Sequence, residues 1–348
     1  MKLIIIVQKI DINDDNLSFF YRTLEKFSER LDEVYAICLS EGEHHLPKNI
    51  KVLSLGKERG YSKIRQLWRL QKFLLAHLSE ARGVYVHMGP VFAIASFPLA
   101  KIFGKKLILW YAHGATPLKL KIAEKLVDNI VTSSPDGCRL SSKKIEALGQ
   151  GIDTELFRPV QEARLPREAG LLSFRLLYAA RLVPVKGHAT LIEAMNILVN
   201  QRKVCNINLK IMGTPLVESE KKYLADLKEQ AKNYKLNEHI EFLAGAPHAK
   251  MPEYYQEADL FVNPSSTGSL DKVVLEAMAA GCLVLTCNEA YKKILADKYI
   301  FEKGNANDLA DKITNLMTAP ADPQLRREIV VKHHNLNNLI DKIIGQFS

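Results

Sequence analysis

Residues 260–281 read LFVNPSSTGSLDKVVLEAMAAG, and three kinds of segment follow one another in them. The apolar run 260–263 is typical of a buried strand, and the loop after it is small and rich in hydroxyl groups. Residues 271–280 have the composition of a helix that Gly281 ends as a C-cap. A buried strand that leads through a loop into a helix is the repeating unit of a parallel α/β sheet.

The same alternation of strand and helix runs through most of the chain. In the first half we expect strands at 3–7, 34–39, 52–55, 84–87, 107–111 and 129–133, with helices at 19–30 and 63–78. In the second half we expect strands at 175–179, 207–212, 240–243, 260–263 and 283–287, with helices at 188–199, 217–234, 271–280 and 306–317. The pattern predicts an α/β protein with two Rossmann-like, doubly wound sheets.

The length of the chain also favours two domains, because one hydrophobic core rarely serves more than about 250–300 residues. A polar stretch that prolines bracket, at 158–172, has no periodicity and is the predicted linker. We therefore expect an N-terminal domain at 1–157 and a C-terminal domain at 173–320, followed by helices at 321–348 that return to the N-terminal domain. Ligands of doubly wound sheets bind at the carboxyl ends of the strands, so a shared ligand is expected in the cleft between the domains.

Composition is that of a globular protein, with 47% hydrophobic and 25% charged residues. No apolar run approaches the roughly 18 residues of a membrane span. The apolar run at 3–7 is too short for the core of a signal peptide. The five cysteines are scattered and predict reduced core thiols, which favours a cytoplasmic protein.

Positive charge is concentrated in one region of the chain. Residues 48–144 hold 18 Lys or Arg against 5 Asp or Glu. Such a surface attracts anionic lipid, nucleic acid or an anionic substrate. Lys101, Lys105 and Lys106 lie beside the apolar stretch 91–103 and favour an anionic membrane, so we expect a peripheral protein on the inner membrane face. We find no nucleic-acid recognition motif and expect no nucleic acid as a partner.

The sequence lacks the binding motifs for several classes of ligand. The first strand is followed by residues 8–15, which contain no glycine, whereas an NAD-binding fold needs glycines there. No P-loop motif occurs. No His, Cys, Asp or Glu residues have metal-ligand spacing, so we expect no metal and no resident cofactor.

Two cations follow the predicted strand 175–179 just before a helix begins. Arg181 offers a planar bidentate donor and Lys186 a compact ammonium, and together with the helix N-terminus they suit a diphosphate. Backbone N–H groups at 269–271 open another helix and are also able to bind phosphate oxygens. The alternative is that both cations are solvated loop residues.

A lone carboxylate stands in the middle of the apolar helix 271–280. Glu276 is costly to bury there unless it has a partner. The two hydroxyl groups of a ribose match its two oxygens. An internal salt bridge is the alternative.

These motifs resemble the retaining glycosyltransferases of family 4, whose fold is GT-B. The matching segments of the second half are R-L-x(3)-K-G at 181–187, the strand end at Gly213, residues 257–265 and residues 275–281. In the first half, the matching segments are 110–114, 133–135 and 149–157. The resemblance spans about residues 107 to 318, and the combination is specific although each piece alone is weak.

The resemblance implies a role for individual residues. Arg181 and Lys186 would hold the diphosphate of a UDP-, GDP- or ADP-sugar and stabilise the leaving nucleotide, and Glu276 would bind the ribose. His113 would contact the donor sugar and its phosphates across the cleft, although a lone strand-end histidine is often structural. The donor loop would comprise Gly268, Ser269, Leu270, Asp271 and Lys272. Enzymes of this family are metal-independent, because cations replace magnesium.

The sequence departs from the family at two places. Members usually carry E-x(7)-E, but the residue eight before Glu276 is Gly268. Asp271 either substitutes for the missing glutamate or is an ordinary first-turn acid of the helix. The glycine-rich loop after the first strand is replaced by the acidic segment 11–15, which we expect on the acceptor side.

Three functions remain open from the sequence. The leading hypothesis is a retaining hexosyltransferase that moves a sugar from a nucleotide diphosphate sugar to a glycan or lipid-linked acceptor in cell-surface polysaccharide biosynthesis. The second is a non-catalytic GT-B subunit that binds nucleotide sugar and supports a partner enzyme. An epimerase or phosphorylase is third, because phosphorylases are much longer and an epimerase needs carboxylates that we cannot place.

Overall fold

The computed structural model describes residues 1–14, 17–159, 173–265, 268–318 and 323–348. Packing divides the chain into two compact units: unit 1 comprises 1–151 and 334–348, and unit 2 comprises 152–333. Most of the predicted linker, 158–172, lies outside the described residues. Among the described residues, no helix has both the length and the apolar character that crossing a bilayer requires.

Unit 1 contains a parallel sheet with the strand order β3-β2-β1-β4-β5-β6-β7. Its strands are β1 Lys2–Ile10, β2 Glu33–Glu41, β3 Ile50–Ser54, β4 Gly83–His87, β5 Lys106–Trp110, β6 Asn129–Thr132 and β7 Ile145–Ala147. Leu3, Ile4 and Ile5 in β1 are all fully buried. Their continuous burial follows from the central place of β1, where helices cover both faces of the sheet.

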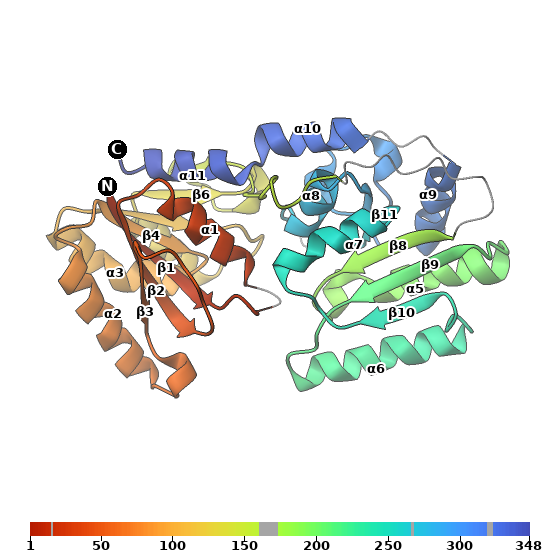
Figure 1. Ribbon diagram of the computed structural model, residues 1–348, viewed down its shortest axis with the longest axis horizontal. Helices are drawn as coiled ribbons and strands as arrows, with labels where there is room; N and C mark the ends of the chain where they lie inside the picture. Colours follow the sequence, from red (N-terminus) through yellow and green to blue (C-terminus); the bar gives the residue numbers. More distant parts are fainter. Residues whose placement is uncertain (15–16, 160–172, 266–267, 319–322) are drawn as a thin grey trace. The chain divides into compact units, whose positions relative to one another are not determined.

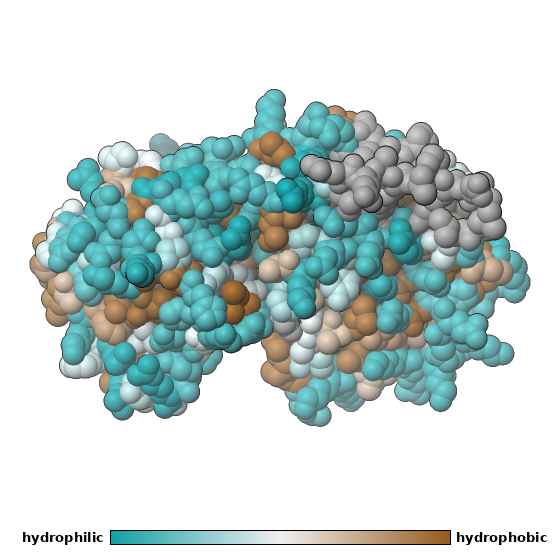
Figure 2. Space-filling model, viewed as in Figure 1, coloured by the Kyte–Doolittle hydropathy of each residue, from teal (hydrophilic) through white to brown (hydrophobic). Residues whose placement is uncertain are grey.

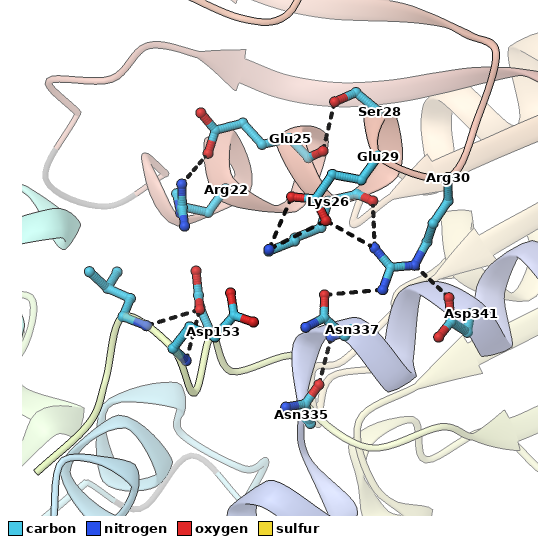
Figure 3. Close-up of polar contacts among 12 residues, drawn as sticks. Arg22, Glu25, Lys26, Ser28, Glu29, Arg30, Asp153, Asn335, Asn337 and Asp341 are labelled. Carbon is cyan, nitrogen blue, oxygen red and sulfur yellow. Dashed lines mark hydrogen bonds and ion pairs between the residues drawn. The ribbon is translucent and has the colours of Figure 1, made fainter.

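Two helical layers enclose the sheet of unit 1. The helices are α1 Phe19–Ser28, α2 Lys63–His77, α3 Pro90–Ile102, α4 Leu118–Leu126 and α11 Leu336–Gly345. One hydrophobic cluster lies under α1 and α11, and another lies under α2, α3 and α4. The layer of α1 and α11 is fastened by Arg30, which bonds Asp341 at 2.5 Å and Asn337 at 3.1 Å (Figure 3). The last helix therefore completes the fold of unit 1.

Unit 2 contains a second parallel sheet, with the order β10-β9-β8-β11-β12 (Figure 1). Its strands are β8 Phe174–Ala179, β9 Ile207–Met212, β10 Ile240–Leu243, β11 Leu260–Asn263 and β12 Leu283–Thr286. Its helices are α5 His188–Asn196, α6 Glu218–Asn233, α7 Met251–Glu257, α8 Lys272–Ala279, α9 Ala306–Thr318 and α10 Pro323–His333. Two separate parallel sheets with helical layers confirm the predicted α/β class.

The strand order of unit 2 brings two distant loops together. β8 is hydrogen-bonded to β11, with Leu176 opposite Leu260. The loop after β8 and the loop after β11 therefore leave the same edge of the sheet side by side. The C-cap of α8 is Ala280 rather than the expected Gly281, and Gly281 follows it with a φ of 79°, the left-handed conformation that ends a helix.

One expectation about the core is wrong. All five cysteines are free thiols, and four are buried, but Cys205 is exposed in the segment before β9.

Candidate nucleotide-sugar site

The loop from β8 to α5 is held tightly against the loop after β11. Gly187 has a φ of 73°, and a Cβ atom there would lie 2.4 Å from the carbonyl oxygen of Pro264. Only glycine permits this approach. The hydroxyl of Tyr178 donates to the carbonyl of Lys186 at 2.5 Å. These contacts fix the backbone from which the Lys186 side chain projects.

Lys186 reaches across to the loop after β11 and to the start of α8. Its Nζ donates to Asp271 Oδ1 at 2.9 Å and to Ser265 Oγ at 3.1 Å. The side chains of Lys186 and Asp271 are only 15% and 10% exposed. Burial opposes ionisation of Asp271, but the Lys186 charge and hydrogen bonds outweigh it and lower the pKa of the carboxyl.

The second oxygen of Asp271 is also occupied. Asn263 and Asn288 donate to Oδ2 at 3.1 Å and 2.9 Å. The hydroxyl of Tyr291 donates to the Asp271 carbonyl at 2.6 Å. Although Asp271 stands at the N-cap position of α8, its side chain makes no capping hydrogen bond. Asp271 therefore anchors Lys186 rather than acting as an ordinary first-turn acid.

Arg181 differs from Lys186 in its surroundings. Its side chain is exposed at the carboxyl edge of the sheet. Within the described part of the chain, no hydrogen bond or ion pair engages its guanidinium. A guanidinium without a partner is suited to bind an anion, and Lys186 follows Arg181 by five residues at the same edge of the sheet.

Glu276 is paired inside unit 2. Its Oε1 lies 2.9 Å from His248 Nε2, and the hydroxyl of Tyr255 donates to Oε2 at 3.2 Å. The side chain is only 5% exposed. Burial opposes ionisation, but His248, Lys272 and Tyr255 lower the pKa of the carboxyl on balance. The internal pair that the sequence left open is present, and ribose binding by Glu276 stays a prediction.

Lys272 opens helix α8 beside these acids. Burial lowers the pKa of its ammonium from 10.5 to about 8, although the nearby Glu276 charge acts in the opposite direction. A bound anion would favour the charged form of this lysine and raise its pKa.

The rest of the expected donor loop is shaped by backbone geometry. Gly268 has a φ of 71°. Leu270 is buried, and the carbonyl of Ser269 accepts a bond of 2.7 Å from Asn288 Nδ2. Gly268 places no side chain where the family pattern has a glutamate.

His113 belongs to unit 1, beyond the carboxyl end of β5. Its backbone forms an isolated bridge with Cys138, and its side chain is exposed. The N–H of Ala115 donates to His113 Nδ1 at 3.0 Å. In the neutral ring Nδ1 is thus the acceptor, and Nε2 carries the proton and is available as a donor.

The structure thus brings together Lys186, Asp271 and Ser265, and places Glu276 in α8, five residues after Asp271. Sequence reasoning missed the partners Asn263, Asn288, His248 and Tyr255. Asn263 and Asn288 carried a signal, because each is a polar residue at or just beyond the carboxyl end of a buried strand. In the described ranges, no three His, Cys, Asp or Glu side chains are grouped closely enough to hold a metal ion. Metal independence stays a prediction.

Comparison with known proteins identifies similar sequences. Residues 171–332 match the family model described as glycosyl transferases group 1. Mannosylfructose-phosphate synthase of Agrobacterium fabrum is 29% identical over 145 residues, which are 41% of this chain and 32% of that protein. A GDP-mannose-dependent alpha-(1-6)-phosphatidylinositol monomannoside mannosyltransferase of Mycobacterium tuberculosis is 30% identical over 216 residues, 55% of this chain and 54% of that protein. The chain spans about half or less of the length of these two relatives.

Solved structures extend the likeness to both units. The crystal structure of Anabaena HepE in complex with UDP and glucose has a TM-score of 0.77 at 15% identity and covers 99% of both chains. A sucrose-phosphate synthase from Thermosynechococcus elongatus has a TM-score of 0.75 at 16% identity, covering 99% of this chain and 98% of that one. The likeness confirms the predicted GT-B fold.

Proposed function

We propose that this chain transfers a sugar from a nucleotide diphosphate sugar to an acceptor hydroxyl with retention of configuration, since residues 171–332 match the family model of the group 1 glycosyl transferases. The observation that carries the proposal is the pair of cations after β8. Arg181 is exposed and has no hydrogen bond or ion pair within the described part of the chain, and Lys186, five residues later in the same loop region, is held by Asp271 and Ser265. Both stand at the strand edge where ligands of such sheets bind.

Lys186 remains able to bind a phosphate while it is paired with Asp271. An ammonium has three N–H donors, and the contacts with Asp271 and Ser265 use two of them. The third donor is left for a diphosphate oxygen. Asp271 is therefore proposed as a positioning residue for Lys186, not as a substitute for the missing glutamate.

The chemistry requires stabilisation of a leaving diphosphate. The bond between the anomeric carbon and the diphosphate oxygen breaks, and the acceptor oxygen forms a bond to that carbon on the same face. The acceptor proton passes to a diphosphate oxygen. Arg181 and Lys186 neutralise the charge that develops on the diphosphate, and the proposed site contains no metal.

The roles of Glu276 and His113 complete the proposal. Each carboxylate oxygen of Glu276 has two lone pairs and therefore can accept a further hydrogen bond. The ribose hydroxyls would gain access to these oxygens when the His248 side chain turns aside. The proton on His113 Nε2 is proposed to contact the donor sugar or its phosphates. The mycobacterial relative is named as GDP-mannose-dependent, and the HepE structure is a complex with UDP and glucose. Both support a nucleotide sugar as the donor.

The proposed acceptor is a glycan or a lipid-linked sugar in cell-surface glycan synthesis. A phosphatidylinositol monomannoside is named as the acceptor of the mycobacterial relative, which supports a lipid-linked class. The excess of positive charge over residues 48–144 is compatible with an enzyme that acts at an anionic membrane surface.

A non-catalytic nucleotide-sugar-binding subunit is the second candidate. It is favoured by Gly268, which offers no carboxylate at the place of the first glutamate, and by the commitment of Asp271 to Lys186. Both functions require binding of a nucleotide sugar, but only the glycosyltransferase converts it to products.

Incubation with UDP-, GDP- and ADP-sugars tests the proposal. We expect slow hydrolysis of one donor in EDTA, with release of the nucleoside diphosphate and an initial sugar product of the donor's anomeric configuration by NMR. Donor binding without hydrolysis or transfer to any acceptor tried would favour the non-catalytic subunit. Neither binding nor hydrolysis of any donor would contradict both.

A further inference from the structure

Helix α2 exposes an apolar face. Ile64, Leu67, Trp68 and Leu75 recur at helical spacing and are 82%, 49%, 63% and 54% exposed. We call these four residues the α2 stripe. The buried side of the helix is carried by Leu70 and Leu74 instead. The α2 stripe is thus additional to the apolar residues that the fold itself requires.

Cations flank the α2 stripe. Residues 63–77 contain four Lys or Arg and no Asp or Glu. Lys63, Arg65 and Lys72 have no carboxylate partner among the described residues. The Lys72 ammonium lies 5.7 Å from the centre of the Trp68 ring. These cations are therefore available to an anionic partner.

Two other cations of the basic region are less available. Lys105 donates to the Ser79 carbonyl at 3.2 Å, and Lys106 donates to the carbonyls of Gln346 and Ser348. Both lysines, expected from sequence to form the membrane surface, thus bind the chain itself. In Figure 2, hydrophobic surface is visible at the left of the view, in the region where Figure 1 draws α2 and α3.

We propose that the α2 stripe docks into the headgroup region of an anionic membrane, with Lys63, Arg65 and Lys72 at the lipid phosphates. An in-plane amphipathic helix combines Trp and Leu on one face with Lys and Arg around it. Protein interfaces are instead depleted in lysine. The charge of α2, together with the excess of positive charge over 48–144, favours lipid over a second copy of the chain.

The inference names the surface that would bring the proposed enzyme to a lipid-linked acceptor, but docking needs no sugar transfer. The test therefore contains no nucleotide sugar, so docking and catalysis fail separately. Flotation with phosphatidylcholine vesicles, with and without about 30% phosphatidylglycerol, measures binding at low and high salt. We expect flotation only with the anionic vesicles and a loss of binding at high salt.

Tryptophan fluorescence identifies the docking face. Trp68 is 63% exposed, whereas Trp110 is only 4% exposed. Anionic vesicles should shift the emission of the native protein to shorter wavelength. The shift should disappear in Trp68→Phe, because Trp110 is already buried.

Two matched pairs of variants test whether vesicle binding depends on the α2 stripe and its flanking cations, or on any exposed apolar or basic residues. Ile64→Ser with Leu75→Ser should abolish flotation, whereas Leu216→Ser with Val217→Ser, at 60% and 53% exposed positions of unit 2, should not. Changing Lys63, Arg65 and Lys72 to Glu should lower the partition coefficient at least on the order of 100-fold. The control changes Lys222, Lys228 and Lys232 to Glu.

Circular dichroism checks that each variant is folded. Absence of native binding at low salt overturns the inference, as does native-like flotation of a folded α2 variant. Concentration-dependent dimerisation through the α2 stripe without vesicle binding also overturns it, in favour of a second copy of the chain.

Discussion

Lys186 and Asp271, 85 residues apart in the sequence, form an ion pair with Nζ 2.9 Å from Oδ1. Both side chains are largely buried, and the remaining oxygen of Asp271 is occupied by two asparagine amides. The pair joins the loop after β8 to the start of α8. The ion pair therefore stabilises unit 2 and holds the Lys186 ammonium in place at the proposed diphosphate site.

Breaking this pair from one side should destabilise unit 2. Lys186→Met leaves a buried carboxylate without its main partner, and Asp271→Asn leaves a buried ammonium. Each should lower the free energy of unfolding by about 3 kcal/mol. The double variant should lose clearly less than the sum, as urea unfolding will measure. Strict additivity would mean that the two side chains are not coupled.

Acid should weaken the fold through the paired carboxyls. The pKa values of Asp271 and Glu276 are lower in the folded chain than their ordinary values of 3.8 and 4.5, despite burial, because of Lys186 and His248. Their stabilisation is complete above the unfolded pKa values and is lost as pH falls through the folded ones. Urea unfolding between pH 7 and about 3 should show a shallower decline for Asp271→Asn than for the native chain. Parallel curves would contradict this assignment.

Lys272 should make diphosphate binding depend on pH. Its pKa of about 8 in the free protein should rise when a diphosphate binds near its amine. Affinity is then complete below about pH 8 and falls as pH rises through that value, with proton uptake on binding. Calorimetry of nucleoside diphosphates between about pH 7 and 9.5 measures both effects. Lys272→Met should remove the dependence, and Lys222→Met should keep it.

Glu276 should distinguish ribose from deoxyribose. If its oxygens accept bonds from the ribose hydroxyls, the 2′-deoxy nucleoside diphosphate should bind the native chain about tenfold more weakly. Glu276→Gln should reduce this preference. His248→Ala should keep it, because the ribose hydroxyls would donate to the Glu276 oxygens and not to His248. A native protein that does not discriminate would show that Glu276 serves only its internal pair with His248.

The sequence was sufficient for the fold because the apolar strands of both sheets are separated by loops and amphipathic helices. Strand β11 and helix α8 were predicted to within a residue or two. Helices α3, α4 and α7 and strand β7 were not predicted. α7 and β7 are short, and the nearly uniform apolar character of α3 gives little helical periodicity.

The site was predictable only in part. The proximity of Lys186 to the loop after β11 follows from the pairing of β8 with β11, which a doubly wound order implies. The partner of Glu276 did not follow, because His248 comes after the edge strand β10 and nothing in the local sequence specifies where that loop turns. The Lys186 contact of Asp271 was likewise invisible, since a helix-start acid usually faces solvent or its own helix.

Nucleoside diphosphate binding to the native chain and to Arg181→Ala, measured by calorimetry in EDTA, tests the central claim most directly. We expect UDP, GDP or ADP to bind the native chain and the folded variant to lose about tenfold to 100-fold in affinity, because a bidentate charged contact is removed. Equal affinity in the two proteins, or no binding of any nucleoside diphosphate to the native chain, would contradict a diphosphate site at Arg181 and Lys186.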